Sequence, residues 1–339
     1  MQKEPLFGKT LTEIQAIVAQ LGLPKFTSTQ IIDWMYKKDV ASIEAMSNIS
    51  ARNCELLQEK YELGVSLPVK EQKSIDGTKK YLYATGEGQF IEAAYIPDDN
   101  RSTLCVSSQV GCKMGCVFCM TGKQGFQQQL TAGEILNQIR SLPERSKLTN
   151  IVYMGMGEPF DNLDEVMKSL EILTAEWGFG MSPRRITVST IGLIPAMRTF
   201  IEQSQCHLAI SLHTPFDDER KELMPIQNKY SIKSVVDALK KYNWDGQRRV
   251  SFEYIMFKGL NDTPNHVKEL TRLLSGLKCR LNLIRFHPIP DALFVGTADK
   301  DIVAFRDALT AKGLFTSIRQ SRGLDIFAAC GLLSTKGIE

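Results

Sequence analysis

The sequence predicts an α/β protein. Its larger part is expected to be an incomplete barrel of about six strand–helix units, preceded by a small helical domain and a β-hairpin. From residue 98 onward, short apolar runs of strand length alternate with amphipathic helical segments, which is typical of a parallel sheet covered by helices. Six units are too few for the eight of a closed barrel, so one side is expected to stay open. With 339 residues, 43% of them hydrophobic, the chain can bury a core of this size.

Residues 1–65 are expected to form the helical domain, an accessory part. Apolar residues recur there at helical spacing, as Leu11, Ile14 and Val18 illustrate. Residues 66–97 alternate polar and apolar positions instead, with a turn signal at Asp76-Gly77. This segment is predicted to be a hairpin that links the helical domain to the barrel.

The barrel is expected to occupy residues 98–330, and a short tail follows at 331–339. Its strands are predicted where apolar runs stand between segments of helical periodicity. In one such helical segment, Leu163, Val166 and Leu170 share a face. The predicted strands are residues 103–107, 150–154, 185–190, 207–211, 250–255, 280–285 and 316–319.

Three cysteines follow the first of these strands on one short loop, at Cys112, Cys116 and Cys119. Cubane iron–sulfur clusters normally bind four cysteines, so a chain that supplies three either borrows a fourth ligand or leaves one iron open to a small molecule. A structural zinc site would close all four positions with a second Cys or His pair, and the sequence contains none. The loop also follows the carboxyl end of a strand, where the chemistry of such barrels gathers. Three thiolates on this loop can therefore hold three corners of a cubane iron–sulfur cluster.

The composition limits the setting in which the protein works. A net charge of +3 neither requires nor excludes nucleic acid as a partner. No apolar stretch approaches the ~20 residues of a membrane span, and the N-terminus lacks the apolar core of a signal peptide. The eight cysteines are scattered. We therefore expect a cytoplasmic protein without membrane contact, in a reducing compartment that suits an oxygen-sensitive cluster.

The spacing of Cys112, Cys116 and Cys119 resembles the signature of the radical S-adenosylmethionine (SAM) enzymes. In that family the open iron binds the amino and carboxylate groups of SAM, and one electron from the cluster then cleaves SAM to a 5′-deoxyadenosyl radical. Such chemistry is used on carbons that are too inert for polar substitution. The resemblance implies a radical SAM barrel with one cluster per chain, held by these three cysteines.

Several stretches narrow the resemblance. They are Leu104–Cys112, Met154–Pro159, Ser182–Gly192, Ala209–His213, Asn282–Pro290 and Asp325–Gly331. Together they resemble the RlmN/Cfr family of radical SAM RNA methyltransferases over almost the whole chain, more loosely in the first sixty residues. RlmN-type members methylate C2 of an adenosine in the peptidyl-transferase centre of 23S rRNA, and of the adenosine 3′ of the anticodon in certain tRNAs. Cfr-type members methylate C8 of the same ribosomal adenosine.

The resemblance implies roles for three residues. Cys330 matches the methyl-accepting cysteine, which becomes an S-methylcysteine, and Cys105 matches the resolving cysteine, which forms a transient disulfide with it. Two SAM molecules are then used per turnover. Glu92 matches the carboxylate that accepts the proton from the adenine carbon. Taken alone, the cysteines would read as packed core residues and Glu92 as a solvated strand residue.

Seven further positions match the SAM-binding residues of the family. They are Gly157, Glu158, Ser189, Ser211, Leu212, His213 and His287. Glycine allows close approach of the backbone, and a carboxylate suits the amino group of SAM. His287 departs from the asparagine that many family members carry, although it still offers a donor or an acceptor.

We expect RlmN-type methylation at C2, the widespread housekeeping activity, with 23S rRNA and tRNA as partners. The C8 reaction is the nearest alternative, because the shared cysteines do not separate the two. A radical SAM activase acting on a protein or a small molecule would leave Cys105 and Cys330 idle. A non-catalytic module that binds RNA is the third alternative. An electron donor of flavodoxin type and a monomeric chain are also expected.

Basic residues gather near the hairpin and near two barrel strands. They are Lys70, Lys73, Lys79, Lys80, Arg184, Arg185, Arg248 and Arg249. Contact with RNA phosphates is one interpretation, and a solvated surface explains each lysine equally well.

Overall fold

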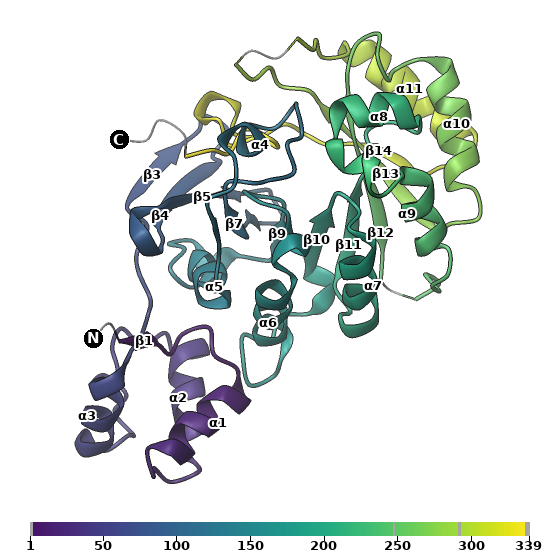
Figure 1. The fold of residues 1–339 in the computed structure, drawn as a ribbon. Helices are drawn as coiled ribbons and strands as arrows, with labels where there is room; N and C mark the ends of the chain where they lie inside the picture. Colours follow the sequence, from purple (N-terminus) through teal and green to yellow (C-terminus); the bar gives the residue numbers. More distant parts are fainter. Residues whose placement is uncertain (1–2, 247, 291–292, 336–339) are drawn as a thin grey trace.

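A computed structural model describes residues 3–246, 248–290 and 293–335 (Figure 1). One ten-stranded sheet dominates this part of the chain, in the order β14-β13-β12-β11-β10-β9-β6-β5-β4-β3. The strands from β6 to β14 in that sheet run parallel. They are β6 (Thr103–Cys105), β9 (Asn150–Tyr153), β10 (Ile186–Thr190), β11 (His207–Ser211), β12 (Val250–Met256), β13 (Cys279–Arg285) and β14 (Thr316–Ile318).

Each predicted barrel strand is present, with its ends within two residues of the prediction. Helices connect successive parallel strands and lie along the outside of the curved sheet (Figure 1). The partial α/β barrel predicted from the sequence is therefore confirmed. The helices of the barrel are α4 (Met120–Gln124), α5 (Ala132–Arg140), α6 (Leu163–Thr174), α7 (Ile194–Gln203), α8 (Asp217–Leu223), α9 (Ile232–Leu239), α10 (Pro264–Leu274) and α11 (Asp299–Ala311).

Helix α5 shows how local sequence sets these elements. Thr131 and Glu134 form a capping box, in which each side chain accepts the backbone N–H of the other residue. Ile135, Leu136 and Ile139 then face the core, as helical spacing requires. The cap satisfies N–H groups that the first turn leaves without helical partners, so the helix begins at a defined residue after the cysteine loop.

The predicted hairpin corresponds to β4 (Lys79–Ala84) and β5 (Phe90–Ile96), which pair antiparallel. The structure adds β3 (Lys70–Lys73) outside β4, and it pairs β5 with β6. The segment is therefore the antiparallel end of the main sheet rather than a separate link. β3 gave no strand signal because all four of its residues are polar and exposed.

The N-terminal domain contains α1 (Leu11–Gln20), α2 (Thr27–Tyr36) and α3 (Ala51–Lys60). The short strands β1 (Glu4–Pro5) and β2 (Tyr61–Glu62) close it. Its α2 packs on the barrel through Tyr36, whose ring lies 5.6 Å from that of Phe179. Glu13 of α1 also accepts a bond of 2.6 Å from Lys168 of α6.

Strands β7 (Gln109–Val110) and β8 (Gln128–Gln129) form a small separate pair beside the cysteine loop. The C-terminal segment returns to this region and lies beside α4 (Figure 1). The last four residues of the predicted tail at 331–339 lie outside the described residues. In the part of the chain that the structure describes, no helix has the length and apolar character needed to cross a bilayer.

Candidate active site

The cysteine loop is closed by backbone hydrogen bonds. Cys112 N–H donates to Gly125 O at 3.1 Å, and Cys119 N–H donates to Cys116 O at 3.2 Å. Gly111 has a φ of 71°, and a Cβ there would overlap the carbonyl of Gly125. Glycine at this position therefore lets the two ends of the loop meet.

The thiols of this loop suit a cluster better than a single ion. Within the described ranges, no set of three His, Cys, Asp or Glu side chains converges on one ion. The ligands of a cubane bind separate irons, so they need not converge on one point. Burial raises the pKa of Cys112 to about 12 and that of Cys116 well above its ordinary value, and the neighbouring thiols add to both shifts. Buried thiols of this kind become thiolates when a metal centre binds them. The three cysteines therefore fit a [4Fe–4S] cluster.

Gly157 and Glu158 follow β9 and lie beside this loop. Gly157 has a φ of 99°, and a Cβ there would overlap the side chain of Gln109. The Glu158 carboxylate is buried and accepts N–H bonds from Phe160 at 3.2 Å and from Ile191 at 3.0 Å. Burial raises its pKa to about 7, and these bonds oppose the rise. The carboxylate thus ties the loop after β9 to the end of β10, besides any contact with SAM.

A buried arginine joins the ends of the next two strands. Arg220 of α8 donates to Ile191 O at 2.9 Å, to Ser211 O at 3.0 Å and to Leu212 O at 3.2 Å. A fourth bond of 2.8 Å reaches Gln227. Burial lowers the pKa of Arg220 to about 10, and nearby Cys116 opposes this shift. Arg220 therefore holds two of the predicted SAM-binding positions next to the cluster loop.

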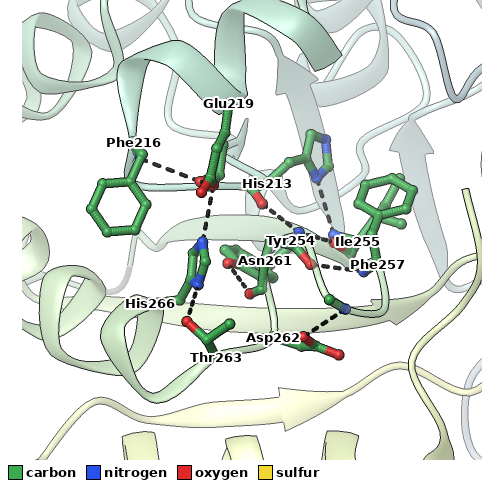
Figure 2. A network of polar contacts seen from close by, with 12 residues as sticks. His213, Phe216, Glu219, Tyr254, Ile255, Phe257, Asn261, Asp262, Thr263 and His266 are labelled. Atoms are coloured by element: carbon green, nitrogen blue, oxygen red, sulfur yellow. Dashed lines mark hydrogen bonds and ion pairs between the residues drawn. The ribbon is translucent and has the colours of Figure 1, made fainter.

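His213 is locked into the same end of the barrel (Figure 2). It has a φ of 59°, and its Nδ1 accepts the N–H of Ile255 at 3.0 Å. Asn261 donates to the His213 carbonyl at 2.7 Å. Burial lowers the pKa of His213 to about 3, so the ring is neutral and carries its proton on Nε2. The ring meets Phe118 of the cysteine loop edge-on at 4.7 Å.

The remaining predicted SAM contacts lie at two places. Ser189 is half-buried on β10 and pairs in register with Ala209 of β11. His287 lies on the loop after β13, where its Nε2 is 2.9 Å from the hydroxyl of Ser321. The contacts of all seven positions with SAM stay predictions.

Cys105 and Cys330 come together although they are far apart in sequence. Cys105 and Ala328 belong to one buried apolar cluster, while Cys330 is exposed. Burial raises the pKa of the Cys105 thiol to about 12, nearby Cys330 adds to the shift, and Arg319 opposes it. Arg319 Nη1 also lies 3.3 Å from the buried carboxylate of Glu253. The two thiols therefore share one charged neighbour, and both are free.

Glu92 lies on β5 and borders a cavity of about 260 Å³. It is 3% exposed, and its Oε1 lies 2.8 Å from Lys80 Nζ. Ser334 N–H donates to its Oε2 at 3.0 Å. Burial raises the pKa of Glu92, while Lys80 and Ser334 oppose the rise. Phe327, which also lines the cavity, is 61% exposed and has a φ of 54°. A bulky residue in this conformation is a true outlier, and such strain clusters at functional sites.

The segment that carries Cys330 is fastened to the turn between β3 and β4. Asp76 accepts the N–H of Gly323 at 2.8 Å. In the other direction, Asp325 accepts the hydroxyl of Ser74 and the N–H of Ile75, the latter at 3.1 Å. These three hydrogen bonds, here called the aspartate latch, hold the segment that carries Cys330 beside the cavity.

Several of these residues were missed in the sequence. They are Lys80, Asp76, Arg220, Arg319 and Phe327. For Lys80 the sequence offered a phosphate contact or a solvated residue. The second interpretation is wrong because Lys80 is buried against Glu92, and the first stays a prediction. Arg220 stands in a run of charged residues that looks like a solvated helix face, so the sequence carried no signal for its burial. Asp76 was recognised only as part of a turn.

A parallel barrel with a three-cysteine loop after its first strand defines a radical SAM enzyme. In agreement, residues 106–274 match the radical SAM superfamily. This membership implies a [4Fe–4S] cluster and SAM. Residues 5–63 match the ribosomal RNA large subunit methyltransferase N-terminal domain.

Similar proteins show which family of radical SAM enzymes the chain belongs to. The chain is 60% identical to a Bacteroides fragilis protein named probable dual-specificity RNA methyltransferase RlmN, over 99% of this chain and 97% of the relative. It is 40% identical to the dual-specificity RNA methyltransferase RlmN of Syntrophobacter fumaroxidans, over 97% of this chain and 98% of the relative. A crystal structure of a radical SAM methyltransferase from Sphaerobacter thermophilus matches with a TM-score of 0.91 and 41% identity. The match covers 97% of this chain and 99% of that chain. The chain belongs to the RlmN family, as the sequence motifs predicted.

Proposed function

We propose that this protein is a dual-specificity RNA methyltransferase that methylates adenine C2 in 23S rRNA and in tRNA, through a methylated Cys330. The names of its relatives support RNA as the substrate. One structural observation carries the covalent scheme. An exposed Cys330 is held by the aspartate latch near a buried Cys105, and the same C-terminal segment borders the cavity that holds Glu92.

The cofactors have clear candidate ligands. Cys112, Cys116 and Cys119 would hold the cluster, and the ends of β9, β10 and β11 would hold SAM. When bound, the cluster and SAM supply a radical able to remove hydrogen from an unactivated C–H bond. The proposal includes two SAM molecules per turnover, a flavodoxin-type electron donor, a monomeric chain and a cytoplasmic location.

The protein's own residues account for the remaining steps. The Cys330 thiolate accepts a methyl group from the sulfonium of the first SAM, because an exposed sulfur is open to displacement chemistry. Once that methyl carbon is bonded to adenine C2, Glu92 takes the proton from C2. The Cys105 thiolate then attacks the sulfur of Cys330, so that an S–S bond forms as the C–S bond to the product breaks. The electron pair of the broken bond stays on the methylene carbon, which takes up a proton and becomes the methyl group of the product. Reduction of this disulfide by an external thiol restores both cysteines.

Other parts of the chain are assigned to RNA handling. The domain at residues 1–65 is assigned to RNA handling. The antiparallel strands at 66–97 join it to the core at 98–330, which carries the chemistry. An adenosine inside folded RNA must leave its stack to reach the cavity. Phe327, exposed at the cavity, is placed to stack on the extruded base.

The test is to purify the protein without oxygen, reconstitute its cluster and supply SAM, a reductant and RNA. We expect a methyl group on Cys330 and 2-methyladenosine in the RNA, both identified by mass spectrometry. Cys330→Ala should abolish methylation. Full turnover by Cys330→Ala would overturn the scheme, and 8-methyladenosine as the product would overturn the assignment to C2.

A further inference from the structure

A second large depression lies at the opposite end of the barrel from the cysteine loop. It has a volume of about 700 Å³ and is lined by residues at the amino ends of β10, β11, β12 and β13. Arg184 and Arg185 stand just before β10, and His207 begins β11. Arg249 precedes β12, and Lys278 precedes β13. None of the residues that carry the proposed chemistry lines this depression.

The lining of the depression is strongly basic. It includes six cationic side chains and no Asp or Glu. The net charge of the whole chain is only +3, so this density of positive charge is local. The six are Arg184, Arg185, Arg248, Arg249, Lys278 and Arg280.

Not all six of these cations are available to a ligand. Arg248 is not, because its guanidinium donates to the carbonyls of Ile201, Cys206 and Phe200 and so builds the wall. Arg184 and Arg249 are exposed, and their side chains form no hydrogen bond or ion pair with any residue that the structure describes.

His207 lies in the depression, and the positive charges around it affect its pKa. Burial lowers its pKa to about 4, and four arginines of the depression, Arg249 first, lower it further. These positive charges therefore act on one point within the depression. A site of this kind attracts an anion with several negative charges.

We propose that the depression binds backbone phosphates of the RNA substrate, as a second contact site remote from the methylated adenosine. The inference rests on the proposed function, which makes RNA the partner. Guanidinium groups match phosphate oxygens in geometry as well as in charge. A membrane surface fits less well, since the large apolar residues of the lining, Trp244 and Val250, are buried and leave nothing to insert into lipid.

The position of the depression limits which RNA can use it. Strands of five to seven residues separate it from the cysteine loop, and at about 3.3 Å per residue they span roughly 17–23 Å. An RNA that fills the active site must pass around the barrel to reach Arg184 and Arg249. A folded tRNA or an rRNA domain is large enough to do this, whereas a short stem-loop with the target adenosine is not.

The experiment compares Arg184→Glu/Arg249→Glu with a control of equal charge change, Arg198→Glu/Lys268→Glu. The control residues are exposed on α7 and α10 and do not line the depression. Dissociation constants are measured for a full-length tRNA and for its anticodon stem-loop at several salt concentrations. We expect the first variant to bind the full-length tRNA roughly tenfold more weakly than wild type. Its slope of log K against log salt should fall by about 2, one for each lost phosphate contact.

For the anticodon stem-loop, Arg184→Glu/Arg249→Glu should lose no more affinity than the control variant does. The second site would be overturned if Arg184→Glu/Arg249→Glu lost equal affinity for full-length tRNA and for the stem-loop. It would also be overturned if both double variants lost equal affinity for full-length tRNA. Thermal unfolding of both variants is measured as well, so that a loss of binding can be told from a loss of fold. Formation of 2-methyladenosine by the wild-type enzyme is scored separately, so failure of the proposed function is distinguished from failure of this inference.

Discussion

Lys80 and Glu92 form an almost fully buried ion pair between adjacent strands, with Nζ 2.8 Å from Oε1. In the β4–β5 ladder Glu92 stands opposite Leu82, so Lys80 is its diagonal neighbour on the same face. Burial favours the protonated form of the carboxyl group, and Lys80 opposes that effect. The lysine therefore favours the ionised form of Glu92, which the proposed role as proton acceptor requires.

Lys80→Met should leave a buried carboxylate without its cation. We expect the free energy of unfolding to fall by about 3–5 kcal/mol, measured by urea denaturation. The pKa of Glu92 should rise further, so the acid limb of the methylation rate should move to higher pH. Lys79→Met is the matched control, because Lys79 pairs with Glu71 and Glu144 and not with Glu92. An unmoved acid limb in Lys80→Met would contradict this role.

Asp76→Asn should loosen the aspartate latch and with it the Cys330 segment. Hydrogen bonds led by that from the Gly323 N–H lower the pKa of Asp76 to about 2, against the effect of burial. The stability from this carboxylate is therefore complete above its ordinary pKa of 3.8 and is lost as the pH falls towards 2. At neutral pH we expect a loss of about 1–2 kcal/mol and faster hydrogen exchange at Gly323. Asp99→Asn, an exposed aspartate after β5 that takes no part in the latch, should change neither, and equal exchange in both variants would count against the latch.

Arg220→Lys should weaken the cluster end of the barrel even though the charge is kept. Lysine cannot reproduce the guanidinium contacts with Ile191, Ser211 and Leu212, so buried carbonyls would lose their donors. We expect a loss of about 2–4 kcal/mol in the free energy of unfolding and less iron and sulfide after reconstitution. Arg198→Lys, on the surface of α7, serves as the control. Wild-type iron content in Arg220→Lys would refute the positioning role.

Phe327→Ala should weaken binding of RNA at the cavity. Stacking of a base on an aromatic ring contributes about 1–3 kcal/mol, so KM for RNA should rise about tenfold or more. Phe327→Tyr retains a ring and should restore KM. Equal KM values for the alanine and tyrosine variants would show that the ring does not stack on the base.

The barrel could be predicted because each of its strands is an apolar run between helical segments, and the cysteine loop because its spacing is specific. Other features depend on contacts between distant residues. Asp76 meets Gly323, 247 positions away, and nothing in the spacing of either residue indicates that contact. The burial of Arg220 was equally hidden, since its partners are backbone carbonyls, which every residue carries.

The pairing of β5 with β6 has a consequence for how the protein can be shortened. β5 occupies the hydrogen-bonding edge of β6, the first barrel strand. A truncated chain that began after β5 would present that edge bare to solvent, as a template on which other chains could add strands. Such a fragment would keep the cysteine loop and still be prone to self-association and precipitation.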